Sequence, residues 1–152
     1  MSKCCILVID DEEIVRRGYA RALTAADCVV HTAWDAKDAL AALERRAFDV
    51  VLLDLRMPEA NGLDVLRTIK DKWPESEVVI VTGYPSLETA KEAVRLGACD
   101  YLAKPVAPDQ VIHAASGAMR RKRWALQPLK GSTPTTSICG LAQARPDSRR
   151  ES

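Results

Sequence analysis

Three acidic residues, a threonine and a lysine follow short apolar runs of the sequence. They are Asp10 and Asp11 after residues 4–9, Asp54 after 50–53, Thr82 after 78–81, and Lys104 after 101–103. A single acid after an apolar run is usually a solubilising loop residue, but five polar residues at matching positions argue against that interpretation. Three carboxylates held together repel one another, so a divalent cation would neutralise them, and an all-oxygen ligand set suits Mg2+ better than zinc. The pattern predicts a metal and phosphate site.

The surrounding sequence predicts strands and helices that position these residues. Five β-branched runs are expected to be strands, at residues 4–9, 28–32, 50–53, 78–81 and 101–103. Apolar residues recur with helical spacing between them. Asp35, Asn61 and Ser86 can cap three of these helices, and Gly97 suits a helix end. A fifth helix is expected from about residue 108 to 121.

This alternation of strands and helices predicts an α/β domain with a parallel sheet covered on both faces. Such sheets bind ligands at the carboxyl ends of their strands, where we expect the five polar residues. The glycine-rich nucleotide motifs are missing from the sequence, and residues 54–56 do not form the D-x-D of aspartyl phosphatases. His31 and His113 follow no predicted strand and are interpreted as packing or surface residues.

Length and composition predict one folded domain with an appendage. The 152 residues are 47% apolar and 28% charged, which excludes a fully disordered or fibrous chain. The longest apolar run, residues 4–9, is far shorter than the roughly 18 residues of a membrane span. Four acidic residues follow that run directly, so a secretion signal is not expected. We expect a cytoplasmic location instead. An odd number of cysteines without a C-x-x-C pair favours reduced thiols: Cys4, Cys5, Cys28, Cys99 and Cys139.

Charge divides the chain into an acidic body and a basic tail. Residues 1–119 hold 14 Lys and Arg against 19 Asp and Glu, whereas the whole chain has a net charge of +1. Helical periodicity ends near Trp124, so we expect a domain at 1–121 and a disordered basic tail at 122–152. The run Arg120 to Arg123 is interpreted as cations at a helix C-terminus, with contact to nucleic acid or anionic lipid as the alternative. The tail has no room for a helix-turn-helix, so nucleic-acid binding is not expected.

Four segments carry a resemblance to a known family. They are Leu-Val-Ile-Asp-Asp-Glu at 7–12, Leu-Leu-Asp-Leu-Arg-Met-Pro at 52–58, Val-Thr-Gly-Tyr at 81–84 and Tyr-Leu-Ala-Lys-Pro at 101–105. With these segments, residues 3–121 resemble the receiver domain of two-component response regulators. The resemblance implies a doubly wound, flavodoxin-like (βα)5 fold whose five parallel strands have the order 2-1-3-4-5.

The resemblance also implies a role for each candidate residue. Asp54 would accept a phosphoryl group, and Thr82 and Lys104 would contact it. The metal ligands would be Asp10, Asp11, Asp54 and the backbone carbonyl of Arg56.

Other residues would shape or switch the site. Tyr101 matches the switch aromatic that responds to Thr82, and Pro105 matches a cis proline. Met57, Pro58 and Gly62 would shape the loop that leads into the third helix. We also hypothesise that Arg56 and Tyr84 shield the acyl phosphate from water.

By resemblance, the chain takes a phosphoryl group from a sensor histidine kinase or a phosphotransfer protein in a Mg2+-dependent reaction. Phosphorylation would change the surface of the fourth helix, fifth strand and fifth helix, which faces an unknown downstream protein or output domain. The chain would catalyse only its own phosphorylation and dephosphorylation, and would not be a metabolic enzyme.

Several alternatives stay open at this point. One is an interaction module of the same fold that works without phosphorylation, although the intact acids, Thr82 and Lys104 count against it. Another is a Mg2+-dependent phosphatase, which needs a substrate pocket and an acid–base partner that the sequence does not reveal. The sequence also leaves open a homodimer through the fourth-helix to fifth-helix surface, and whether the chain is a stand-alone receiver or a piece of a larger regulator.

Overall fold

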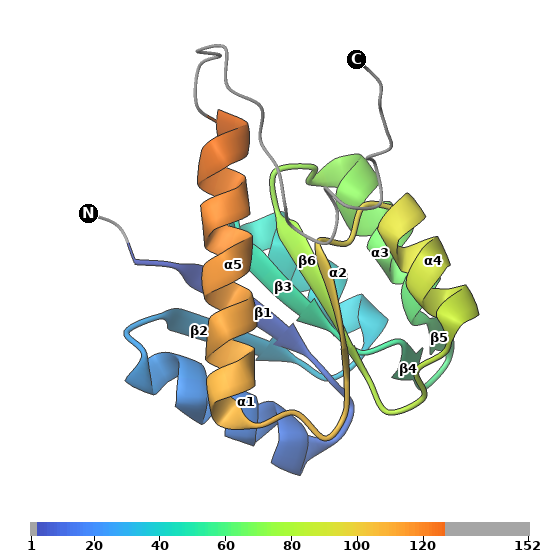
Figure 1. The fold of residues 1–152 in the computed structure, drawn as a ribbon, viewed down its shortest axis with the longest axis horizontal. Coiled ribbons are helices and arrows are strands. Elements are labelled where there is room, and N and C mark those ends of the chain that lie inside the picture. The colour runs from blue at the N-terminus through green and yellow to red at the C-terminus, as the bar shows by residue number, and fades with distance from the viewer. Residues whose placement is uncertain (1–2, 127–152) are drawn as a thin grey trace, which may run out of the picture.

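The computed structural model describes residues 3–126 of the chain (Figure 1). Its elements in order are β1 (Cys5–Ile9), α1 (Glu13–Ala25), β2 (Val29–Ala33), α2 (Ala36–Arg45), β3 (Val50–Leu53), β4 (Arg56–Met57), β5 (Ala60–Asn61), α3 (Gly62–Lys72), β6 (Glu77–Thr82), α4 (Leu87–Arg95), β7 (Asp100–Ala103) and α5 (Pro108–Leu126). Five strands form one parallel sheet in the order β2-β1-β3-β6-β7. The strands β4 and β5 form a separate pair, so β6 and β7 are the fourth and fifth strands of the predicted sheet. The predicted order 2-1-3-4-5 is therefore confirmed.

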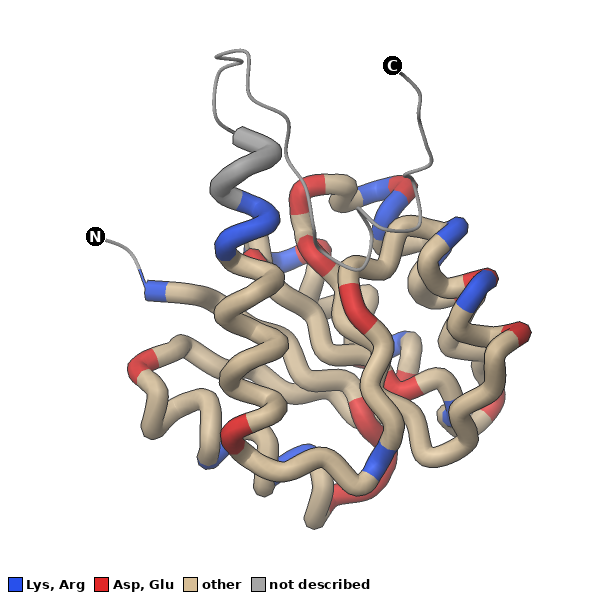
Figure 2. The backbone as a smooth tube through the Cα atoms, in the orientation of Figure 1, with Lys and Arg blue, Asp and Glu red and all other residues tan. Residues whose placement is uncertain are grey.

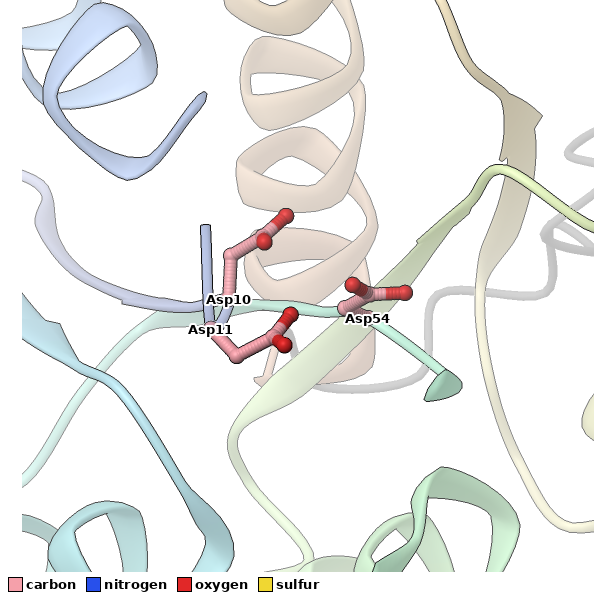
Figure 3. A group of neighbouring side chains, drawn as sticks. All are labelled: Asp10, Asp11 and Asp54. Carbon is pink, nitrogen blue, oxygen red and sulfur yellow. The ribbon is translucent and has the colours of Figure 1, made fainter. Parts of the chain in front are cut away.

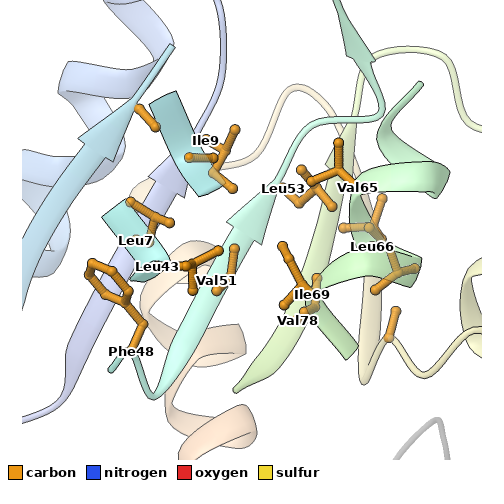
Figure 4. Close-up of a cluster of buried hydrophobic side chains, with 14 of the residues drawn as sticks. Leu7, Ile9, Leu43, Phe48, Val51, Leu53, Val65, Leu66, Ile69 and Val78 are labelled. Atoms are coloured by element: carbon orange, nitrogen blue, oxygen red, sulfur yellow. The ribbon is translucent and has the colours of Figure 1, made fainter. Parts of the chain in front are cut away.

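The sheet separates two apolar layers because alternate strand residues point to opposite faces. Leu7 and Ile9 of β1 pack on the face covered by α2, α3 and α4, as Figure 4 shows for part of this cluster. Ile6 and Val8 pack on the other face, against α1 and α5. With both faces buried, the inner strands β1 and β3 are apolar along their whole length, and β6 is apolar between its terminal residues Glu77 and Thr82.

The short hairpin of β4 and β5 was not foreseen from the sequence. It forms a separate antiparallel pair in which Met57 faces Ala60, and it leads directly into α3. A Cβ on Gly62 would overlap the backbone of Asp54 and Leu55, so only glycine lets the chain pass this close to the end of β3. The predicted loop-shaping place of Gly62 therefore has a steric reason.

The predicted helix starts are confirmed by their hydrogen bonds. The side chains of Asp35, Asn61 and Ser86 accept from the backbone N–H groups of Asp38, Leu63 and Thr89, at 2.8, 2.9 and 3.0 Å. Gly97 has a φ of 108° just after α4, a conformation that suits glycine at a helix end. These caps fix where each helix leaves the edge of the sheet.

Helix α5 continues to Leu126, so its predicted end near Arg121 is wrong. Basic residues lie shortly before its end (Figure 2), and two of them meet acids beside the sheet. Arg121 lies 3.5 Å from Glu77 and Lys122 lies 3.2 Å from Asp49. These ion pairs help hold the extended helix against the sheet, despite the weak helix formers Ser116 and Gly117. Of the predicted tail, residues 127–152 lie outside the described part of the chain.

Within residues 3–126, none of the helices combines the length and hydropathy needed to cross a bilayer. The cytoplasmic location expected from the sequence stays a prediction.

Candidate functional site

The ends of four parallel strands bring the predicted polar residues to one edge of the sheet, named here the carboxyl edge. Asp10 follows β1, Asp54 follows β3, Thr82 ends β6 and Lys104 follows β7. Backbone hydrogen bonds continue the sheet by one residue at this edge: the N–H of Asp54 donates to Ile9 at 3.1 Å, and that of Lys104 donates to Thr82 at 2.8 Å. Main-chain pairing therefore sets the positions from which the side chains start.

Three carboxylates meet at this edge (Figure 3). Each of Asp10, Asp11 and Asp54 offers one oxygen atom, and these oxygens lie within 4.8 Å of one another. Asp10 and Asp54 are buried, at 2% and 4% exposure, whereas Asp11 is exposed. Such a group concentrates negative charge where little water reaches two of its members. It forms an acidic pocket that could bind a metal ion.

The ammonium group of Lys104 lies among these acids. Its Nζ is 2.8 Å from Asp10, 3.2 Å from Asp54 and 3.3 Å from Glu12. Burial acts to lower the pKa of Lys104, but the hydrogen bond to Asp10 and the charges of Asp54 and Asp10 outweigh it and raise the pKa. Lys104 therefore keeps its positive charge across the physiological pH range.

Asp54 is held in an environment that penalises its negative charge. Burial raises the pKa of this carboxyl, and the nearby charge of Asp10 raises it further. The N–H of Arg56, which donates to Asp54 Oδ1 at 3.2 Å, and the ammonium of Lys104 act in the opposite direction. Asp54 is thus a buried carboxylate whose two oxygens each accept a hydrogen bond, Oδ1 from Arg56 and Oδ2 from Lys104.

Thr82 is fully buried at the end of β6. Its Oγ1 accepts a hydrogen bond from the N–H of Tyr84 at 3.1 Å, which ties the hydroxyl to the loop before α4. The guanidinium of Arg56 lies over the ring of Tyr84, 4.0 Å from its centre. The two residues of the shielding hypothesis, Arg56 and Tyr84, are therefore in contact with each other.

Tyr101 is half-buried in β7, and its hydroxyl contacts the start of α4. The Oη atom lies 2.6 Å from Thr89 Oγ1 and accepts from the N–H of Ser86 at 3.2 Å. Tyr101 is therefore linked to the N-terminal cap of α4. The Lys104–Pro105 bond is cis, as the resemblance implied.

Three residues of the site were not singled out from the sequence. Glu12 contacts Lys104, and its own N–H donates to Asp10 at 2.9 Å. The guanidinium of Arg16 donates to the backbone oxygen of Asp10 at 2.7 Å. Tyr19 is buried, and Lys104, Asp10 and Asp54 all influence its pKa, which burial raises. Their place in α1 or just before it, following the paired acids, is the signal that could have identified them.

Large apolar side chains are exposed around the same edge. Ile14 lies in the first turn of α1, Trp34 follows β2, Tyr84 follows β6 and Leu87 begins α4. Between 59% and 87% of each is exposed. Exposed apolar groups beside a polar site are typical of a surface that contacts another molecule.

Comparisons of sequence point to one family. The model of the response regulator receiver domain matches residues 6–116. The alginate biosynthesis transcriptional regulatory protein AlgB of Pseudomonas aeruginosa is 44% identical over 111 residues, which cover 73% of this chain and 25% of AlgB. The DNA-binding transcriptional regulator NtrC of Salmonella typhimurium is 34% identical over 149 residues, which cover 97% of this chain and 32% of NtrC. The chain thus spans a quarter to a third of the length of these relatives.

A comparison of structures agrees. The CheY-like receiver domain protein of Methanospirillum hungatei superimposes with a TM-score of 0.79 and 27% identity, over 82% of this chain and 99% of that one. The fold, the order of the strands and the match over residues 6–116 lead to one conclusion. The chain belongs to the response regulator receiver domain family.

Proposed function

We propose that the chain accepts a phosphoryl group on Asp54 in a Mg2+-dependent reaction and passes the signal on through a change in its surface. One observation carries this proposal: the carboxylates of Asp10, Asp11 and Asp54 converge at one edge of the sheet, next to the ammonium of Lys104. Acids alone would support a metal site. The added lysine and the buried Thr82 provide partners for phosphoryl oxygens as well.

The donor set of the site fits Mg2+. Asp10, Asp11 and Asp54 offer hard oxygen ligands, and an exposed Asp11 leaves room for the water molecules that Mg2+ usually retains. We assign the carbonyl of Arg56, two residues beyond Asp54, as a further ligand. Mg2+ bound there would disperse negative charge on the transferring phosphoryl oxygens.

Asp54, Lys104 and Thr82 each have a different role in the proposed transfer step. A carboxylate oxygen of Asp54 attacks the phosphorus atom, the bond from phosphorus to the donor breaks, and the donor leaves with the electron pair of that bond. Lys104 meets the negative charge of the phosphoryl group, and the Thr82 hydroxyl donates a hydrogen bond to it. The product is an acyl phosphate on Asp54.

The same contacts connect phosphorylation to the surface. A phosphoryl group that draws Thr82 toward it also pulls on the N–H of Tyr84 and on the loop before α4. That loop ends at Ser86, which contacts the hydroxyl of Tyr101. We therefore propose that Thr82 and Tyr101 couple the site to the surface formed by α4, β7 and α5.

The phosphoryl donor is proposed to be a protein, a sensor histidine kinase or a phosphotransfer protein. Ile14 and Trp34 are exposed on the β1 and β2 side of the acids, and Leu87 is exposed on the β6 side. Apolar groups on both sides of the site would bury against the donor and hold its phosphohistidine over Asp54. A small donor would gain nothing from groups so far apart.

Receiver domains of response regulators act together with histidine kinases and output domains. The relatives AlgB and NtrC are named as transcriptional regulators and are three to four times as long as the matched region. We propose that this chain likewise controls an output domain or a separate downstream protein. A homodimer through α4, β7 and α5 stays a prediction, and Glu92 and Arg95 on this surface pair with each other within α4.

The test is the intact mass of the protein after incubation with acetyl phosphate and Mg2+. We expect one phosphoryl adduct, which is absent in an Asp54→Asn variant and in the presence of EDTA. An adduct that persists in the variant would contradict the assignment of Asp54. A folded wild type that forms no adduct would instead favour the interaction module that works without phosphorylation, and turnover of a phosphomonoester would favour the phosphatase.

A further inference from the structure

Two cysteines lie opposite each other at the amino ends of neighbouring strands. Residues Cys5 and Val29 pair in the parallel register of β1 and β2, so Cys4 and Cys28, one position earlier, face each other. The N–H of Val29 donates to the carbonyl of Cys4 at 2.8 Å, which shows that the pairing extends to this position. Neighbouring strands lie about 4.8 Å apart, within the range of Cα separations that a disulfide bridges.

The side chains of this pair share one face of the sheet. Cys4 and Cys28 both pack against the apolar cluster beneath α1 and α5, and both are partly exposed to solvent. The two thiols are close enough to form a hydrogen bond with each other. Cys5 packs on the opposite face, so it lies on the wrong side of the sheet to reach Cys28.

We propose that Cys4 and Cys28 are a redox-modification site, which forms an intramolecular disulfide by exchange with a low-molecular-weight disulfide such as oxidised glutathione. The sequence predicts reduced thiols at all five cysteines, and Cys4, Cys5 and Cys28 are free thiols. That interpretation stands for the reduced protein, and the proposal adds what this pair does when an oxidant is present.

The two thiols have different roles in the exchange. Burial, the nearby charges of Cys28 and Asp49 and the hydrogen bond with Cys28 raise the pKa of Cys4 to about 12. Burial and the nearby charge of Asp27 also raise the pKa of Cys28 above its ordinary value, but the hydrogen bond with Cys4 limits that rise. Cys28 is thus the thiol that ionises first, and the thiolate is the form that attacks a disulfide.

The reaction proceeds in two balanced steps. The Cys28 thiolate attacks one sulfur of oxidised glutathione, which gives a mixed disulfide and one glutathione thiolate. Cys4 then loses its proton, its sulfur attacks the Cys28 sulfur, and a second glutathione thiolate leaves. The two protein thiols are oxidised by two electrons, and the glutathione disulfide is reduced to two thiols. Once Cys28 is in the mixed disulfide it carries no negative charge, so one of the causes that raise the pKa of Cys4 is removed.

The location of the pair separates this site from the acids. Cys4 precedes β1 and Asp10 follows it, so the whole strand lies between the thiols and the carboxyl edge. A disulfide between Cys4 and Cys28 would close the loop that contains α1. Closing a loop reduces the freedom of the unfolded chain, so the oxidised protein should be more stable than the reduced protein.

The experiment uses the full chain with Cys139→Ser in every sample, so that this cysteine takes no part. The protein is treated with oxidised glutathione at pH 7 and pH 8.5, the free thiols are blocked with iodoacetamide, and peptides are assigned by mass spectrometry. We expect a Cys4–Cys28 disulfide, which forms about tenfold faster per pH unit because the thiolate fraction of Cys28 grows in that proportion. The Tm should rise by about 5–10 °C on oxidation and return on reduction.

Single variants separate the roles of the cysteines. Cys4→Ser should stop at glutathione attached to Cys28, Cys28→Ser should form no intramolecular disulfide, and Cys5→Ser should behave as the Cys139→Ser parent. The proposal is overturned if the disulfide joins other cysteines, if it forms only between molecules, or if no disulfide forms in protein that circular dichroism shows to be folded.

Discussion

The two edges of the same sheet both hold acids among cations, but in different proportions. At the carboxyl edge, the ammonium group of Lys104 is shared by Asp10, Glu12 and Asp54, and Asp11 lies beside them. At the opposite edge, named here the amino edge, Glu77 pairs with Arg121 and Asp49 pairs with Lys122. One edge therefore has an excess of negative charge, and the other is close to balance.

This difference separates a site for chemistry from an arrangement that supports the fold. Acids that share one cation raise the energy of the folded state, and binding of a divalent cation relieves their mutual repulsion. The balanced pairs at the amino edge instead join α5 to the sheet. The burial of an acid alone does not distinguish them, because Glu77 is nearly as buried as Asp54.

The largest effect should come from removing the shared cation. Lys104→Met leaves Asp10 and Asp54 buried without their ammonium partner, so we expect the free energy of unfolding to fall by about 2–3 kcal/mol. Phosphorylation by acetyl phosphate should slow by about 100-fold or more, because a positive partner of the phosphoryl group is lost. Chemical denaturation and the initial rate of adduct formation measure the two effects.

A lysine of the amino edge is the matched control for this change. Lys122→Met removes a cation from a partly buried pair with Asp49, which keeps its hydrogen bond from the N–H of Cys5, so we expect a loss of about 1 kcal/mol and an unchanged phosphorylation rate. Equal phosphorylation rates in the two variants would show that the shared lysine has no special role.

Neutralising one acid at each edge should change stability in opposite directions. Asp54→Asn removes a buried charge from an acidic cluster and should stabilise the protein by about 1–2 kcal/mol in the presence of EDTA. Glu77→Gln removes the charge of a buried acid that pairs with Arg121 and should destabilise the protein by about the same amount. Urea denaturation at pH 7 compares both variants with the wild type.

The pH dependence of stability is an independent test of whether the charge of Asp54 destabilises the folded protein. The pKa of Asp54 is raised in the folded state, so the folded protein binds this proton more tightly than the unfolded chain does. The cost of ionisation is therefore fully present at neutral pH and is lost as the pH falls through the raised pKa toward the ordinary value of about 3.9. The advantage of Asp54→Asn should shrink over this range, and an advantage that grows on acidification would contradict the proposed environment.

Binding of Mg2+ should stabilise the protein through the carboxyl edge alone, and by less than the changes above. At ten times its dissociation constant, Mg2+ bound to the folded state adds about 1.4 kcal/mol of stability, which raises the Tm by a few degrees. Asp11→Asn should abolish this rise because it removes an exposed ligand, whereas Asp49→Asn at the amino edge should retain it. Thermal unfolding with and without EDTA provides the measurement, and the same rise in both variants would place the metal elsewhere.

The carboxyl edge was largely predictable from the sequence because its residues follow apolar runs. Once residues 50–53 are a buried parallel strand, Asp54 must begin the loop at the carboxyl end, and the same holds for Asp10 and Lys104. The roles assigned to these residues came from resemblance and stay proposals. The helix caps were also predictable, because Asp35, Asn61 and Ser86 act through hydrogen bonds local in sequence.

The amino edge was not predictable in the same way. The extension of α5 depends on Glu77 and Asp49, which are more than 40 residues away from Arg121 and Lys122 in sequence. Local helix propensity cannot report such pairs, and Ser116 and Gly117 pointed to a shorter helix. Arg16 and Tyr19 were missed for a similar reason, because their places near the acids follow from how α1 packs on the sheet.

The smallest effect should come from removing a contact between a cation and an aromatic ring, measured as the rate at which the phosphoryl group is lost. Arg56 lies over Tyr84 beside the acids, and Lys72 lies 5.0 Å from the ring of Trp73 at the end of α3. We expect the double variant Arg56→Ala with Tyr84→Ala to lose its phosphoryl group about threefold faster, because the pair shields the acyl phosphate from water. Lys72→Ala should leave this rate unchanged.

Each single variant shows whether the contact itself matters. Because the two side chains hold each other in place, Arg56→Ala and Tyr84→Ala should each produce most of the increase, and the double variant should add little to either. Loss of the adduct after removal of acetyl phosphate, followed by intact mass, gives the rates. Increases that multiply in the double variant would mean that the two side chains act separately, and an unchanged rate in all three variants would remove the shielding hypothesis.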